Sequence, residues 1–574
     1  MKFNRYIIYL TTFLSIVVGC HSPKHHDLVI AGVNVIDVNT GEILSDRTVA
    51  IDEDSISEIY EGRISLSDSV KIVDGTGKYL LPGLWDMHIH YNWNYEDTAP
   101  LYVANGVVGV REMWGNTYLI NRIRQQLKEA DMVGPDVYAA GNMIDGQPPI
   151  WNSSVGVSTP EEARNEALSQ IKSGVDFLKV YSRLSREAFD AIAQVANEND
   201  VPFAGHIPWD VSIYQAMESG MASAEHLIGI TDATSSNLDS ILQYRGATLK
   251  KSLMETFDQD KFDSLADVLV NSDLWLCPTL TVNRSIGWLN DSSFINDERM
   301  KYLPKYLTSS WNPENDFRFA GRTDEFYDIQ RQSYQFEAEL LGKLSQKGAK
   351  ILAGTDSPNP YCFPGFSIHD EMSLMVDAGV SNLAALQAST INPARFMKKE
   401  HKFGSIEKGK VANLLLLNGN PLENIKETQS IEMLVLKGEL YAKTKLRKML
   451  EEMQKPPYSP WLKLKIQNEG LTEAMDSLDV LLQLPDSPYR LTEGDLNDLG
   501  NEYMGSKRYE TALTVFNKMI ELFPSSSYAH DSYAEACMKT ESYDRAILHY
   551  QKSYELNPLN TNAKIMIDSL AQDR

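Results

Sequence analysis

The sequence predicts an α/β protein built around a (β/α)8 TIM barrel, with a small β-sandwich formed from both flanks and an all-α TPR domain. Three observations support this fold class. Short apolar runs alternate with helix-like segments over about 320 residues. Stretches rich in β-branched residues lie on both sides of that region. The C-terminal part of the chain repeats with a period of 34 residues.

The barrel is predicted over residues 81–402. Its strands should be short and apolar, because parallel strands that are buried on both faces carry few polar side chains. The runs that fit are 106–110, 137–140, 177–181, 201–204, 222–224, 274–277 and 350–353. Two connecting segments, 228–273 and 282–345, are longer than such connections need. We expect them to form helical lids over the barrel mouth, where barrel enzymes carry their specificity.

The flanking segments, residues 27–80 and 403–445, read as strands separated by turns. β-branched residues dominate Leu28–Asp37, and Ala412–Leu417 shows a second apolar strand pattern. Because two β-rich segments flank a long α/β stretch, we expect them to form one composite β-sandwich built from both ends.

The C-terminal region is predicted to hold TPR repeats over residues 468–574, after a linker at 446–467. Three positions recur 34 residues later with similar side chains: Ala512, Phe516 and Pro524 return as Ala546, Tyr550 and Pro558. This period and these residue types are typical of TPR units. A chance match between two amphipathic helices is the alternative. Such a domain would bind a protein or peptide partner or pack on the barrel.

Residues 1–19 are predicted to be a signal peptide. Lys2 and Arg5 precede an apolar run that is too short to span a bilayer. The run ends at Cys20 in a pattern that resembles the bacterial lipobox, which implies cleavage before Cys20 and lipidation of its sulfur. We therefore expect a lipid-anchored protein of the cell envelope, at the outer membrane or facing the periplasm. A plain secretory signal and an uncleaved anchor are the alternatives.

The charge excludes some classes of partner. The net charge is −24, whereas nucleic acids and anionic membrane surfaces bind clusters of Lys and Arg. The four cysteines are scattered and form no Cys-x-x-Cys pair, which argues against a disulfide framework and a thiolate zinc site. The expected partner at the barrel is a small molecule or dipeptide.

The first candidate for a metal site is the His-x-His motif formed by His88 and His90. Residues two apart on a strand point to the same side, so both imidazoles could bind one divalent metal. The motif alone is a weak signal, since paired core or surface histidines are equally common. Lys179 adds to it, because an ammonium in a strand that should be buried is costly unless it is paired or neutralised. Carboxylation by carbon dioxide and pairing with a carboxylate are both open.

Three further residues end short apolar runs. His206 and His226 follow Lys179 at spacings close to one βα unit each, and Asp356 precedes a Ser-Pro-Asn-Pro loop. A lone histidine at a strand end is usually a hydrogen-bonding residue, and an aspartate there commonly caps a turn. Tyr181 lies two residues after Lys179 and points to the same side of its strand. It could bind a substrate carboxylate or an oxyanion, or pack as a barrel tyrosine.

Together these residues resemble the amidohydrolase superfamily over about residues 27–445, nearest to imidazolonepropionase-like and prolidase-like enzymes. The resemblance implies two divalent metal ions, zinc first among them. One would be held by His88, His90 and Asp356 and the other by His206 and His226, with an N6-carboxylysine at Lys179 bridging them. It further implies hydrolysis of an amide bond, possibly of dipeptides or N-acyl amino acids. Metal-activated hydroxide would attack, and Asp356 would serve as general base and then as general acid.

Two other readings remain open on the sequence. The same metal site could hydrolyse lactones or phosphoesters or release ammonia, because fold does not choose among these reactions. The second alternative is a binding protein, in which a catalytically silent barrel carries a TPR scaffold. Metal content separates it from the enzymes, because a scaffold should hold no metal.

Overall fold

The computed structural model describes residues 25–91, 95–128, 132–484, 486–558 and 560–572. The predicted signal peptide and Cys20 lie outside the described residues. Within the described part of the chain, no helix is both long and apolar enough to cross a membrane.

Parallel strands in the middle of the chain form a hydrogen-bonded circuit. They are β6 (Leu84–Ile89), β7 (Val107–Glu112), β8 (Asp136–Ala139), β11 (Leu178–Val180), β12 (Phe203–Gly205), β13 (Ser223–Glu225) and β14 (Trp275–Cys277). Neighbours pair in this order, with β8 joined to β11 by the bridge between Ala140 and Phe177. Bridges from Leu276 to Ile351 and from Ile89 to Ser357 close the circuit. A small parallel pair, β9 (Ile144–Gly146) and β10 (Val155–Val157), lies beside β11.

The run at 350–353, expected as a strand, takes the last place in the circuit without regular pairing. Ile351 makes one bridge, and the Met87 and Asp356 amides donate to the carbonyls of Ala353 and His88. The backbone at Gly354 passes so close to β6 and β14 that a Cβ there would lie 2.5 Å from the Cys277 sulfur and 2.7 Å from the His88 Cβ. This close approach explains why a glycine interrupts the strand just before Asp356.

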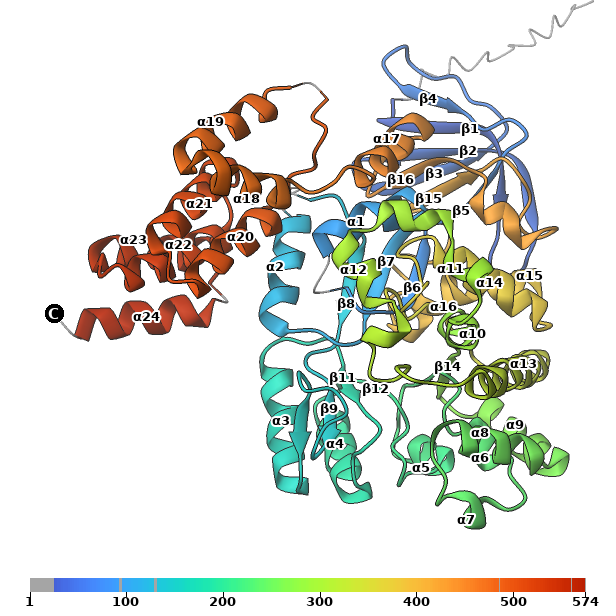
Figure 1. Ribbon diagram of the computed structural model, residues 1–574. Helices are drawn as coiled ribbons and strands as arrows, with labels where there is room; N and C mark the ends of the chain where they lie inside the picture. Colours follow the sequence, from blue (N-terminus) through green and yellow to red (C-terminus); the bar gives the residue numbers. More distant parts are fainter. Residues whose placement is uncertain (1–24, 92–94, 129–131, 485, 559, 573–574) are drawn as a thin grey trace, which may run out of the picture.

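Helices cover the outside of the circuit, as Figure 1 shows. They are α1 (Tyr95–Ala104), α2 (Thr117–Lys128), α3 (Pro160–Lys172), α4 (Arg186–Glu198), α5 (Ile213–Glu218), α14 (Ser367–Asp377), α15 (Asn382–Ala388) and α16 (Ile391–Phe396). Side chains cap four of them: Thr159 and Ser185 accept from the Glu162 and Ala188 amides of α3 and α4, and Ser212 and Ser381 cap α5 and α15 in the same way. Strands and helices share one apolar core.

Strands from both flanks of the barrel pair in one eight-stranded sheet, at the upper right of Figure 1. They are β1 (Leu28–Ile36), β2 (Ile43–Asp52), β3 (Ser55–Glu61), β4 (Lys71–Asp74), β5 (Tyr79–Pro82), β15 (Leu414–Leu417), β16 (Ile431–Leu436) and β17 (Glu439–Ala442). The two ends meet where β5 pairs antiparallel with β15, so that Leu81 lies opposite Leu415. β1 pairs with β2 along one edge and with both β4 and β5 along the other. All eight strands therefore belong to one continuous sheet and not to two separate sheets.

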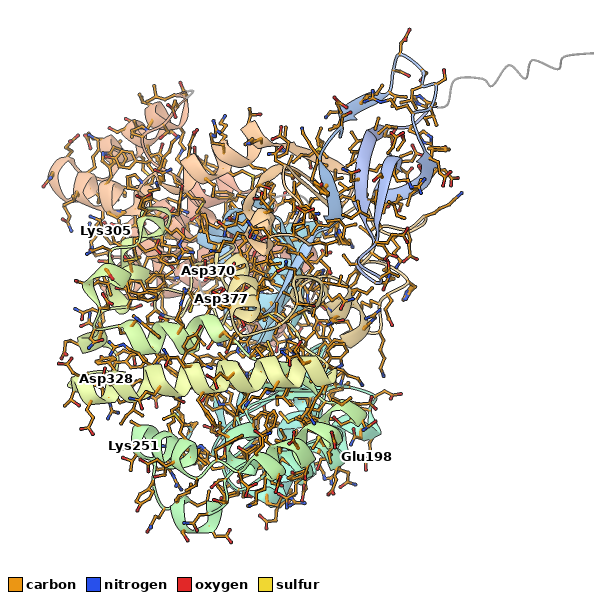
Figure 2. All side chains as sticks on the ribbon, turned by 90° about the vertical axis from the view of Figure 1, so that its right-hand side faces the viewer. Glu198, Lys251, Lys305, Asp328, Asp370 and Asp377 are labelled. Atoms are coloured by element: carbon orange, nitrogen blue, oxygen red, sulfur yellow. The ribbon has the colours of Figure 1, made fainter. Side chains whose placement is uncertain are left out.

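The two long connections are helical, as expected. The first holds α6 (Ile230–Ala233), α7 (Leu238–Ile241), α8 (Gly246–Glu255) and α9 (Gln259–Asn271). The second holds α10 (Leu280–Trp288), α11 (Ser292–Ile295), η1 (Glu298–Tyr302), α12 (Lys305–Ser310), η2 (Pro313–Asn315) and α13 (Asp324–Lys347). In Figure 2, α13 runs across the face of the molecule at Asp328, and α12 lies above it at Lys305. A separate apolar cluster around Trp311 holds the second connection together.

The chain ends in a helical domain. A linker helix, α17 (Lys443–Met453), comes first and buries Leu446 in the barrel core and Met453 in the cluster around Trp311. The helices of the domain itself are α18 (Tyr458–Glu469), α19 (Leu471–Leu482), α20 (Glu493–Gly505), α21 (Tyr509–Leu522), α22 (Ser527–Lys539), α23 (Tyr543–Leu556) and α24 (Thr561–Gln572). From α18 onward they share a core of their own. The repeated positions at Ala512, Phe516, Ala546 and Tyr550 are all buried in it. A Cβ at Gly500 would lie 2.2 Å from the Phe516 ring, so this helix pair requires a glycine there. The assignment to TPR repeats stays a prediction.

This C-terminal helical domain packs on α1 and α2 of the barrel, at the left of Figure 1. Arg122 on α2 is buried between Glu96 of α1, 3.3 Å away, and Glu493 of α20, 3.0 Å away. Glu96 also accepts a hydrogen bond from the Gly494 amide in the first turn of α20, so the barrel caps a helix of the other domain. Of the two roles expected for the domain, packing on the barrel is therefore visible in the structure.

Candidate metal centre

The predicted site residues come together at the ends of the circuit's strands. All of them line one cavity of about 830 Å³: His88, His90, Lys179, Tyr181, His206, His226 and Asp356. The ligand atoms of His88, His226 and Asp356 all lie within 4.8 Å of one another. The carboxyl ends of parallel strands meet at one edge, which explains why residues so far apart in sequence converge.

Asp356 is the carboxylate at the centre of this group. One of its oxygens lies 2.9 Å from His90 Nε2 and 3.5 Å from His88 Nε2, and the other lies 3.9 Å from His226 Nδ1. Burial opposes ionisation of Asp356, but the three imidazoles outweigh burial and hold its pKa below the usual range. Burial also lowers the pKa of His90, yet the contacts with Asp356 and Glu112 raise it to about 9.

The other histidines are neutral and oriented by hydrogen bonds on Nδ1. Nδ1 of His206 lies 2.8 Å from Ser182 Oγ, and Nδ1 of His226 lies 2.6 Å from Thr279 Oγ1. These bonds leave both Nε2 atoms available to a metal. Burial lowers the pKa of His226 to about 4 and that of His206 below its usual range.

Lys179 is buried beneath these residues on β11. Its Nζ has no hydrogen-bond partner among the residues that the structure describes. Burial lowers its pKa to about 8, despite the attraction of Glu225 and Asp356. A buried amine without a partner is costly, and conversion to a carbamate would remove that cost. Four imidazoles, a carboxylate and such an amine form a donor set that suits divalent zinc and a carboxylated lysine.

Glu225, which was not among the predicted site residues, lies directly before His226 and is fully buried. Its carboxylate accepts from His88 Nδ1 at 2.7 Å and pairs with Arg111 Nη2 at 2.9 Å. Ser223 donates to the same carboxylate. Glu225 therefore fixes the His88 ring with Nε2 towards the cavity. The signal was available in the sequence, because Glu225 and Arg111 are charges inside apolar strand runs, as Lys179 is.

Strained backbone marks the same residues. His226 and Asp356 both have φ of +59°, and Thr279, which holds His226, has φ of +47°. The left-handed region costs a residue with a Cβ on the order of 1 kcal/mol or more, and such residues cluster at functional sites. Tyr181 lies just past the end of β11, with its ring stacked on His206 at a centroid distance of 4.0 Å. Its hydroxyl accepts from Trp151 Nε1 at 3.1 Å.

Replacing Glu225 with Gln should weaken zinc binding by about 10- to 100-fold, because the amide no longer holds His88 as the anionic partner does. Competition with a chelator measures the affinity directly. Glu162→Gln, on the exposed end of α3, is the matched control and should bind zinc as the parent does. Equal zinc affinity in the Glu225 and Glu162 variants would contradict the role given to Glu225.

A model of the amidohydrolase family matches residues 79–441. Solved structures with the same fold include a Xaa-Pro dipeptidase with bound methionine, at 21% identity and TM-score 0.55, covering 72% of this chain and 99% of that chain. A bottromycin amidohydrolase matches at 20% identity and TM-score 0.59, covering 74% of this chain and 89% of that chain.

Curated relatives match only over short segments. A probable imidazolonepropionase from Homo sapiens is 35% identical over 109 residues, which are 18% of this chain and 25% of that protein. An adenine deaminase from Clostridium botulinum is 30% identical over 87 residues, which are 15% of this chain and 14% of that protein. The chain thus spans a quarter or less of the curated relatives it matches.

Proposed function

Because the chain belongs to the amidohydrolase family, we propose that it hydrolyses an amide bond of a dipeptide or N-acyl amino acid at a centre of two zinc ions. One observation carries the proposal: a single carboxylate, Asp356, lies among three imidazoles inside a large cavity. Lactone or phosphoester hydrolysis and deamination use similar centres, and they are outcomes of the test below.

The residues divide into ligands and groups that move protons. His88, His90 and Asp356 would hold one metal, His206 and His226 the other, and Lys179 as N6-carboxylysine would bridge them. When bound, the metal pair lowers the pKa of water and polarises a carbonyl. Asp356 stays ionised near neutral pH because the imidazoles hold its pKa low. Its carboxylate can therefore accept the proton of the attacking water and donate it to the leaving nitrogen.

The wall beside Tyr181 offers donors for a substrate anion. Burial raises the pKa of Tyr181 to about 12, so its hydroxyl stays protonated and can donate. Arg318, from the second long connection, lies over the Trp151 ring at 5.3 Å. Its guanidinium donates to Asp316 through two nitrogens and to Asn359 Oδ1 at 3.1 Å. Asn359 in turn donates to the Asp356 carbonyl, which ties Arg318 to the metal loop.

Arg318→Gln is expected to raise KM for an N-acyl amino acid by about tenfold and to leave KM for the matching carboxamide nearly unchanged. A guanidinium-carboxylate contact contributes on the order of 1.5–3 kcal/mol, and only the acid makes it. Steady-state kinetics on N-acetyl-L-methionine and N-acetyl-L-methioninamide give the comparison. An equal rise in KM for both compounds would show that Arg318 supports the cavity and does not bind the carboxylate.

A hydrolysis screen on protein that starts after Cys20, loaded with zinc and bicarbonate, tests the function. Xaa-Pro dipeptides, other dipeptides, N-acyl amino acids, lactones, phosphoesters and adenine are offered, with the Asp356→Asn variant beside the parent. Amide cleavage that the variant lacks supports the proposal. If only ammonia release or ester cleavage appears, the amide assignment is wrong. No turnover and no bound metal would favour a scaffold.

We also propose that the mature protein is lipid-anchored in the cell envelope through Cys20, and that the C-terminal helical domain is a TPR array. The lipobox-like end of the apolar run supports the anchor. The recurrence of buried positions at 34 residues supports the array. Metabolic labelling with an alkyne fatty acid should mark the parent protein and not the Cys20→Ala variant.

A further inference from the structure

We propose that the C-terminal helical domain positions one wall of the active-site cavity, through a contact chain from Arg490 over Asp97 to Tyr306. Arg490 lies just before α20, Asp97 lies on α1 of the barrel, and Tyr306 lies on α12 of the second long connection. Arg490 is on this view a positioning residue. It acts through Asp97 on a segment that contacts the substrate cavity.

One carboxylate joins the three elements. Arg490 Nη2 lies 2.5 Å from Asp97 Oδ1, and the Tyr306 hydroxyl donates to Asp97 Oδ2 at 2.8 Å. The Arg490 and Asp97 side chains are only 7% and 17% exposed. A shielded ion pair of this kind holds its geometry better than an exposed one. Each oxygen of Asp97 thus serves a different part of the molecule.

The segment held in this way is a wall of the cavity. Tyr306, Leu307, Ser310 and Trp311 all line the space that contains the site residues. At the inner end of α12, Trp311 Nε1 donates to the Pro358 carbonyl at 3.0 Å, two residues after Asp356. At the outer end, the Tyr306 side chain is 59% exposed, and its hydroxyl donates to Asp97.

A second path supports the same wall. Met453, at the end of α17, packs in the apolar cluster that contains Trp311 and Leu101 of α1. Arg490 Nη1 lies 3.6 Å from the Met453 sulfur. The linker helix α17 therefore packs on α1 and shares an apolar cluster with Trp311, and Arg490 before α20 reaches the same helix through Met453. A displacement of the domain would be transmitted to the cavity wall.

Hydrogen exchange of the backbone amides in full-length protein tests the proposal without a substrate. Tyr306→Phe removes only the hydroxyl, and we expect amides of residues 305–311 to exchange about tenfold faster. Arg490→Met should produce a similar change at the same amides, although they belong to another domain. The double variant should exchange no faster than the single ones, because both break one chain of contacts.

Lys518→Met is the matched control. It breaks an ion pair of 2.9 Å with Asp479 inside the helical domain, far from α12 in sequence, and should leave exchange at 305–311 unchanged. If Arg490→Met leaves those amides unchanged while Tyr306→Phe speeds them, the helical domain does not position the wall. If neither variant changes them, Asp97 does not hold α12. With the substrate that the hydrolysis screen finds, we expect both variants to raise KM and to leave kcat nearly unchanged.

Discussion

Replacing Asp356 with Asn should lower kcat for the substrate found in the screen by roughly 10³-fold. The reason is that the amide cannot accept the proton of the attacking water or pass it to the leaving nitrogen. The contacts with His88, His90 and His226 keep the parent carboxylate ionised although it is buried, as a proton acceptor must be. Stopped-time assays on metal-loaded protein, with bound zinc counted by elemental analysis, give the result.

The zinc count separates two causes. A variant that retains two zinc ions and loses turnover supports a proton-transfer role for Asp356. One that loses zinc as well shows that ligation dominates. Asp328→Asn, which removes an equal charge on the outer face of α13 (Figure 2), should keep full activity. Near-parent turnover in the zinc-loaded Asp356 variant would rule out the proposed general base.

Removal of carbon dioxide should lower zinc affinity and activity by at least the roughly 10- to 100-fold that loss of an outer-shell partner costs, and bicarbonate should restore them. In the proposed modification, the neutral amine of Lys179 would add to carbon dioxide, form a carbamate and release one proton. Burial lowers the pKa of Lys179 to about 8. At pH 7 the amine is therefore neutral in roughly a tenth of the molecules, whereas an ordinary lysine is neutral in fewer than about one in a thousand. The neutral fraction rises with pH, so restoration should need less bicarbonate at pH 8 than at pH 6.

Carbon-13 bicarbonate makes the adduct visible. We expect one carbamate resonance in the zinc-loaded parent protein and none in Lys179→Ala, which should also lose the bridging ligand and most of its activity. Lys172→Ala, at the end of the exposed helix α3, should keep the resonance. A parent protein that is fully active and shows no carbamate signal would mean that Lys179 serves as an amine and not as a bridge.

The residues that converge on the cavity could be predicted because each one violates a local rule. A lysine in a buried run, histidines at the ends of strands and an aspartate after a glycine are costly without a purpose. Glu225 violates the same rule, but its place directly before His226 drew no prediction for its own side chain. The role of Arg318 could not be predicted, since the second long connection carries no pattern that fixes where its side chains point.

The contact between the barrel and the C-terminal helical domain also could not be predicted from the sequence. Glu96 and Arg122 look like ordinary charges on exposed helix faces, and each finds its partner, Glu493 or Gly494, almost 400 residues away. Charged surface positions carry no signal of what covers them. Helix positions and the buried repeat at Ala512 and Ala546 were predictable, because hydrophobic periodicity shows which face of a helix is buried. Periodicity does not show which element packs against that face.

The pairing of β5 with β15 has a consequence for synthesis. Leu81 and Leu415 lie opposite each other although more than 300 residues separate them. At the usual pace of translation, the first five strands are complete about 15 to 70 seconds before their partner emerges. During that time β5 presents an open apolar edge, which is the kind of surface that aggregates. The nascent chain must therefore be protected over this interval, and the sheet can close only after nearly the whole enzyme part has been made.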